Sequence, residues 1–127
     1  HRRILFDSPL RRTDERAYAR AVLARFLARA YRRPVAAAEI DAKLALYDRV
    51  RPGRSFVDAL KAPLAAALCS PHFLFLVEPG GPRPLDSHER AARLAFFLAA
   101  APPDPRLREL ADAGKLADPV RVRDEAR

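Results

Sequence analysis

The chain has 127 residues, of which 50% are hydrophobic, so it can bury a core and form one ordinary domain or two small ones rather than remain disordered. Its net charge of +8 makes nucleic acid a partner to consider. No apolar run reaches the roughly 18–20 residues that a bilayer-spanning helix needs, so we expect no membrane span. The excess charge lies in residues 1–33, which carry ten Arg against three acidic residues.

Residues 1–12 are predicted to form an extended lead-in, because Ser8-Pro9 blocks a helix. A first helix should begin near Thr13 or Asp14 and end near Arg32, since Pro34 disfavours the helical conformation in the residue before it. At 100° per residue, one apolar stripe is predicted to face the core, formed by Val22, Leu23, Phe26, Leu27 and Ala30. The opposite, solvated face carries Arg25, Arg29 and Arg32.

Two further helices are predicted before the middle of the chain. The first covers 37–50, with Ile40, Leu44 and Tyr47 facing inward, and the second starts after Ser55, contains Pro63 and stops at Ser70-Pro71. The apolar run 72–77 is too short for a typical helix and is predicted to be a buried turn or a short extended piece. Cys69 is predicted to be a small buried thiol.

A linker is predicted at 79–84, where Pro and Gly dominate. The next helix should open with a capping box of Asp86 and Glu89 and run to about Ala101, burying one face with Leu94, Phe97 and Leu98 and another with Phe96. Asp104-Pro105 and Asp118-Pro119 each predict the start of a short helix, and Gly114 the end of the first of them. The sequence therefore predicts an all-α fold, a small helical bundle of about five to six helices.

No catalytic constellation is visible, so whether the protein is an enzyme stays open, and we predict no catalytic, cofactor-binding or metal-binding residue. His72 and His88 are the only internal histidines, and neither has a metal-type spacing. We expect His72 to be structural or partly exposed and His88 to be exposed. Arg16 and Arg20 lie near the apolar stripe, and each is expected to snorkel or to pair with an acidic residue rather than to bind a ligand. The same holds for Arg93, for which a buried pair with a carboxylate would be structural.

The basic first helix is the feature that could bind nucleic acid. Its arginines cluster, but no aromatic side chain lies at the centre of that cluster for base stacking. The helix after Ser55 has Lys61 as its one basic residue, which is too little for a recognition helix. The sequence therefore argues against nucleic acid as a partner.

Several strings taken together resemble a known family pair. Arg2-Arg3-Ile4, the stretch 19–34 and the stretch 68–75 look like one module, and Pro84-Leu85-Asp86 with the stretches 92–98 and 113–119 look like the start of the next. They are similar to adjacent domains of unknown function in large proteins of planctomycete-type bacteria. The resemblance gives a structural role to its motif residues, which are Arg32, Arg33, Pro34, Ser70, Pro71, Phe73, Leu74, Arg93, Leu94, Phe97 and Leu98.

The resemblance also implies a setting. Such proteins are typically exported, and many carry a c-type cytochrome domain elsewhere. The resemblance therefore implies a periplasmic or cell-envelope location, no cofactor in this fragment, and haem c only elsewhere in the parent protein. Family members often have Ser-Tyr-Phe-Leu-Trp where this chain has residues 95–99, and cysteines near positions 7 and 18, here Asp7 and Tyr18. Joint loss of both cysteines would fit a dispensable disulfide. Because the chain begins at His1 and contains no Met, we expect an internal piece of a longer protein.

These observations predict a helical module over 1–78, a linker at 79–84 and the truncated start of a second helical module over 85–127. The favoured function is a non-catalytic structural or interaction module of a large exported, redox-associated protein, with other domains of the same polypeptide as partners. One alternative is part of a catalytic domain of an envelope oxidoreductase or polymer-degrading system, with its active groups outside this fragment. The other is a basic binder of nucleic acid or an anionic polymer.

Overall fold

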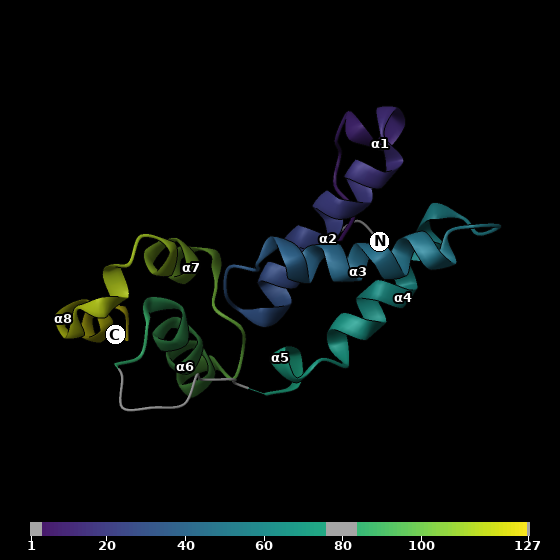
Figure 1. Ribbon diagram of the computed structural model, residues 1–127. Helices are drawn as coiled ribbons and strands as arrows, with labels where there is room; N and C mark the ends of the chain where they lie inside the picture. The colour runs from purple at the N-terminus through teal and green to yellow at the C-terminus, as the bar shows by residue number, and fades with distance from the viewer. Residues whose placement is uncertain (1–3, 76–83, 127) are drawn as a thin grey trace. The chain divides into compact units, whose positions relative to one another are not determined.

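The computed structural model describes residues 4–75 and 84–126, and these residues form helices and no strands (Figure 1). The predicted all-α fold, a small helical bundle, is confirmed. The chain divides into two compact units, residues 1–75 and 76–127, which are called unit 1 and unit 2 below. Most of the predicted linker lies outside the described residues, and the predicted module boundaries stay a prediction.

The described residues of unit 1 form the helices α1 (Leu10–Thr13), α2 (Glu15–Tyr31), α3 (Ala37–Val50), α4 (Phe56–Leu68) and α5 (Pro71–Leu74). The three long helices α2, α3 and α4 pack against one another, and α5 contacts both α2 and α4. Their shared interior is built from the predicted inward stripes of α2 and α3, completed by α4. The largest fully buried side chains there are Tyr18, Val22, Leu23, Leu27, Leu44, Tyr47 and Leu60.

Local capping signals set the ends of these helices. Asp14 accepts a hydrogen bond from the Ala17 amide at 2.8 Å and begins α2, and Ser55 accepts one from the Asp58 amide at 3.2 Å and begins α4. Helix α3 begins and ends at the predicted residues. Helix α2 ends because Arg32 adopts the left-handed conformation, with φ of 60°.

Three predictions for unit 1 are wrong in detail. The lead-in contains the short helix α1, because Pro9 needs no amide partner in a first turn and Ser8 Oγ accepts a hydrogen bond from the Leu10 amide at 3.3 Å. The run after Ser70 forms α5 rather than a buried turn, and its side chains Leu74 and Phe75 are 59% and 64% exposed. Cys69 is exposed rather than buried. Residues 76 and 77 of that run lie outside the described residues.

Unit 2 contains α6 (Ser87–Ala99), α7 (Pro105–Asp112), the 3₁₀ turn η1 (Lys115–Ala117) and α8 (Pro119–Glu125). The predicted capping box is confirmed, since the Glu89 amide donates to Asp86 Oδ1 at 2.8 Å and the Asp86 amide donates to Glu89 Oε2 at 2.7 Å. The predicted N-caps Asp104 and Asp118 also accept amide hydrogen bonds. Gly114, with φ of 68°, follows α7 as predicted, whereas η1 was not predicted.

The prediction that α6 buries two aromatic faces is wrong. Its buried side chains are small, namely Ala91, Ala92 and Ala95 besides Ser87, and the interior of unit 2 joins Ala91 to Ala111 and Leu116. The larger side chains lie outside this interior, with Phe96 at 42%, Phe97 at 87% and Leu98 at 52% exposed. Small residues let α6 approach α7 and η1 closely, so the aromatic residues are left for the surface of unit 2.

Candidate functional site

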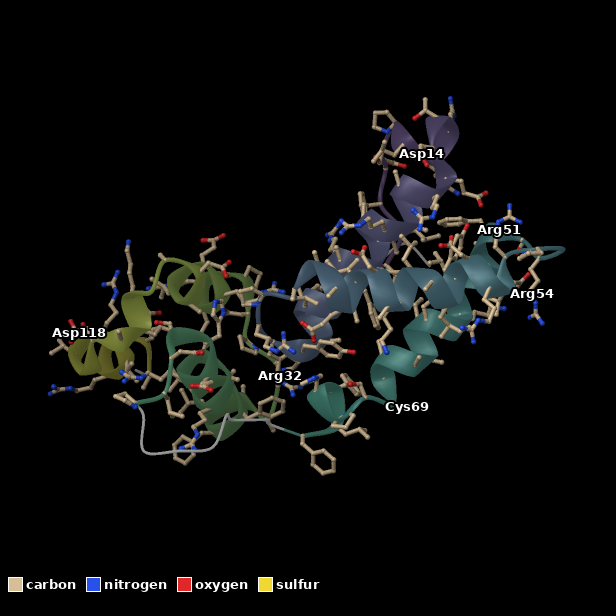
Figure 2. The ribbon with its side chains drawn as sticks, in the orientation of Figure 1. Asp14, Arg32, Arg51, Arg54, Cys69 and Asp118 are labelled. Carbon is tan, nitrogen blue, oxygen red and sulfur yellow. The ribbon has the colours of Figure 1, made fainter. Side chains whose placement is uncertain are left out.

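The two motif segments of unit 1 meet where the end of α2 contacts α5. The Arg32 guanidinium donates to two carbonyls of α5 and to that of the residue after it, with Nη2 at 3.2 Å from the His72 oxygen, 3.4 Å from the Phe73 oxygen and 3.0 Å from the Phe75 oxygen. Figure 2 shows Arg32 beside α5. The last carbonyls of a helix have no partner within it, so Arg32 supplies the donors that α5 lacks.

The predicted placement of Arg32 on the solvated face of the first helix is wrong. The placement assumed that Arg32 is helical, but its backbone is left-handed and lies beyond the end of α2. The side chain therefore points toward α5. Burial lowers the pKa of the Arg32 guanidinium, because the charged form loses hydration. Arg25 and Arg29 are exposed as predicted, with the Arg25 guanidinium 5.2 Å from the centre of the Phe6 ring.

Arg33 fixes the turn that connects α2 to α3. Its guanidinium forms a bidentate pair with Glu39, at 3.0 Å and 2.8 Å, and also donates to the Pro34 carbonyl at 2.9 Å. Glu39 in turn accepts from the Ala36 amide at 3.0 Å. The hydrogen bonds from Arg33, which outweigh the effect of burial, lower the pKa of Glu39 to about 2.

An aromatic contact joins the same two segments. The Tyr31 ring lies 5.4 Å from the His72 ring on one side and 5.7 Å from the Arg33 guanidinium on another. His72 is half-buried, as predicted for a structural histidine. Ser70 Oγ accepts from the His72 amide at 3.3 Å and so begins α5, with Pro71 at its first position.

The remaining motif residues divide between interior and surface. Phe73 packs against the interior of unit 1, whereas Leu74 is exposed. In unit 2, Leu94 is half-buried, and Arg93, Phe97 and Leu98 are exposed. Because Arg93 is exposed, it does not form the buried pair that was considered for it. In unit 1, Arg32 joins the two motif segments through its contacts with α5, while the motif residues of unit 2 lie along α6.

Ion pairs cross between α2 and α3, as predicted for the first two arginines of α2. Arg16 contacts Asp48 at 2.9 Å and Arg20 contacts Asp41 at 3.1 Å. Both pairs are largely exposed, so each stabilises the packing only slightly. They show that Asp41 and Asp48 serve helix packing.

One buried tyrosine carries a network that the sequence did not reveal. The Tyr47 hydroxyl donates to Glu15 Oε1 at 2.7 Å, and Arg51 contacts the same carboxylate at 2.6 Å and 3.0 Å. Burial, followed by the hydrogen bond to Glu15, raises the pKa of Tyr47 to about 12. The pKa of Glu15 is lowered by Arg51 and then by Tyr47. In the sequence, Tyr47 and Arg51 lie one helical turn apart, which indicates that they share a helix face. That spacing does not show that Glu15 is the residue they both contact.

Other groups that could carry chemistry lie apart from one another. His88 is 22% exposed in its side chain, less than predicted, because its Nε2 lies 3.7 Å from Asp112 Oδ1 between α6 and α7. Within residues 4–75 and 84–126, no group of three or more His, Cys, Asp or Glu side chains is placed to hold a metal ion. Across those same residues, no helix has the length and apolar character to cross a membrane.

The described residues line a pocket on the surface of each unit. The one on unit 2 has a volume of about 460 Å³ and is lined by Leu85, Arg90, Arg93, Leu94, Phe97 and Val122. The one on unit 1 has a volume of about 760 Å³ and is lined by Asp7, Ser8, Pro9, Arg11 and Arg12. The first is mainly apolar and includes motif residues of α6, which makes it the better candidate for binding.

Comparison with known proteins gives two matches and no function. No curated protein matches the chain, and no solved structure matches it. Residues 18–78 match the family PSD5, a protein of unknown function (DUF1595), and residues 85–127 match the family PSD4, a protein of unknown function (DUF1592). The chain therefore contains two adjacent stretches that are similar to two protein families of unknown function.

Proposed function

We propose that the chain is a non-catalytic helical module, joined to part of its neighbour, that packs against and positions other domains of a large protein. The observation that carries this proposal is that five arginines of the basic first segment contact groups of unit 1 itself. Among the described residues, five of them contact a carboxylate, a carbonyl or an aromatic ring of unit 1: Arg16, Arg20, Arg25, Arg32 and Arg33. Such use fits a structural unit better than a binding face for a charged ligand.

The proposal extends to the parent protein through the resemblance of the motif strings alone. That resemblance supports an exported, redox-associated protein of the cell envelope or periplasm, with haem c carried outside residues 1–127. Other domains of the same polypeptide would be the partners. These points are proposals about the parent, and inspection of its reading frame for an export signal and Cys-x-x-Cys-His tests them directly.

The competing function for unit 1 is the binding of an anionic polymer. Arg11, Arg12 and Arg29 are exposed, and no ion pair within the described residues involves them. Three cations can neutralise about three phosphates, which gives weak binding with a shallow salt dependence. The other five arginines described in residues 4–33 contact groups of unit 1 itself.

Duplex DNA is expected to bind the full chain no more tightly than about 100 µM at 150 mM salt. Fluorescence anisotropy of a labelled 20-base-pair duplex, measured from low to physiological salt, checks this. The control is the triple variant Arg11→Gln, Arg12→Gln, Arg29→Gln, which should change the signal little. Micromolar affinity that falls steeply with salt and is lost in the triple variant would show a polymer-binding function and overturn the proposal.

A further inference from the structure

The pocket of unit 2 combines an apolar lining with fixed positive charge. Leu85, Leu94, Phe97 and Val122 supply the apolar walls, and Arg93 also lines the pocket. The positive charge whose surroundings are described is the guanidinium of Arg90. Its volume of about 460 Å³ lies in the range of pockets that receive a ligand or an anchoring side chain. The chemistry that complements this lining is an apolar group that lies beside an anion.

Arg90 is held rigidly by neutral acceptors. Its Nε donates to the Leu85 carbonyl at 3.0 Å, and its Nη1 donates to the carbonyls of Leu116 and Ala117 at 3.1 Å and 2.7 Å. Carbonyl oxygens orient a guanidinium without cancelling its charge, and the contacts described for Arg90 include no carboxylate. Arg90 is therefore a preorganised positive charge at an apolar pocket, and a carboxylate is the group best suited to meet it.

The apolar surface continues beyond the pocket along α6. Phe97 lines the pocket and is 87% exposed, and its neighbour Leu98 is 52% exposed. A small ligand in such an open site would leave much of its own surface in water, whereas ligand pockets usually cover most of their ligand. A polypeptide segment can fill the pocket and cover the adjoining side chains at the same time. The open rim therefore favours a segment of protein over a small acid.

We propose that this pocket receives an acidic, amphipathic helix from another polypeptide segment. An apolar side chain of that helix enters between Phe97 and Val122, and a glutamate one turn away pairs with Arg90. Residues one turn apart lie on the same face of a helix, so both groups reach the site together. The inference rests on the proposed function of an interaction module and names the chemistry of one partner.

The test uses the full chain and a labelled 15-residue helical peptide of Leu, Ala and Glu, with a matched peptide that has Gln in place of Glu. The acidic peptide is expected to bind with a Kd of about 10–100 µM, and the Gln peptide about tenfold more weakly, since one charge-assisted hydrogen bond contributes roughly that factor. Phe97→Ser should weaken the acidic peptide by tenfold or more. Because Phe97 is 87% exposed, this variant should fold normally, as circular dichroism can verify.

Matched controls separate the pocket from general stickiness. Phe75→Ser removes a comparably exposed aromatic side chain of unit 1, and Arg123→Gln removes an exposed cation of α8, so both should leave peptide affinity unchanged. Arg90→Gln should abolish the preference of the chain for the Glu peptide over the Gln peptide. Arg90 also holds η1 in place, so this variant could unfold. In that case the result with Phe97→Ser decides the test.

Several results would overturn the inference. These are equal affinity for both peptides, no loss of binding in Phe97→Ser, or displacement of the peptide by decanoate at equal affinity, which would assign a small acid. Self-association of the chain that Phe97→Ser abolishes, seen by sedimentation, would assign a second copy instead. None of these results concerns the contacts that the arginines make within unit 1. The proposed function is tested separately, by the DNA-binding experiment.

Discussion

Replacing Arg32 with alanine is expected to lower the free energy of unfolding of unit 1 by about 2–3 kcal/mol, the usual contribution of hydrogen bonds to a charged group. The substitution leaves the carbonyls of His72 and Phe75 without the guanidinium donors they now have. Arg and Ala bear a similar cost at φ of 60°, so the backbone contribution largely cancels. Tyrosine fluorescence during urea unfolding measures this unit alone, because all three tyrosines lie within it and the chain has no Trp.

Two further variants make the Arg32 prediction specific. Arg29→Ala removes an exposed cation from the last turn of the same helix and should cost about 0.5 kcal/mol or less. Arg32→Gly should destabilise about 1 kcal/mol less than Arg32→Ala, because glycine adopts the left-handed conformation without strain. Equal losses in Arg29→Ala and Arg32→Ala would mean that the contacts of Arg32 with α5 contribute nothing to stability.

Glu39→Gln is expected to destabilise unit 1 by about 2 kcal/mol at neutral pH, after allowance for the partial exposure of the pair. The pKa of Glu39 is about 2 in the folded protein against 4.5 as a model value, because Arg33 and the Ala36 amide stabilise its charged form. A lowered folded pKa stabilises the protein above the unfolded pKa, and this stabilisation is lost as the pH falls toward the folded value. The loss should therefore occur between about pH 4.5 and pH 2.

Unfolding of the wild type and of Glu39→Gln across pH 2–7 measures that contribution. The gap in free energy between the two proteins should be constant above about pH 5.5 and shrink steadily below pH 4.5. Other acidic groups, among them Glu15, titrate in both proteins, so they cancel in the difference. A gap that does not change between pH 7 and pH 2 would show that the charge of Glu39 is not what stabilises the turn.

The long helices could be predicted from the sequence because their signals are local. Asp14, Ser55, Asp86 and Asp104 each cap a helix within three residues of themselves, and the apolar stripes of α2 and α3 follow the helical period. Pairing of Arg16 and Arg20 with acidic residues could also be predicted, because a cation near an apolar stripe lies at a helix contact. Which carboxylates they meet depends on packing.

The Arg32 contacts could not be predicted, because they depend on one left-handed residue and on a segment about 40 positions away. A helical wheel assumes that the helix continues through the residue it places, and α2 ends at Tyr31. The ion pair of Glu15 and Arg51 could not be predicted either, because the two residues lie 36 positions apart. Long-range contacts of single charged groups leave no periodic signal in the sequence.

The surface of α6 was missed for a different reason. Hydrophobicity alone placed Phe96 and Phe97 in an interior, but the packing of unit 2 uses alanines on α6. A helix with both small and large apolar faces can bury either one, and the partner decides which. The same uncertainty applies to Cys69, whose apolar neighbours in sequence do not cover it in the structure.

The central claim is that the arginines of the motif segments build unit 1, and one comparison of matched variants tests it most directly. Arg32→Gln with Arg33→Gln, and Arg12→Gln with Arg29→Gln, each remove two positive charges from the same unit. The measurement is the difference between their free energies of unfolding. The first pair should lose about 3 kcal/mol or more and the second less than about 1 kcal/mol. Equal losses, or a larger loss in the second pair, would contradict the claim.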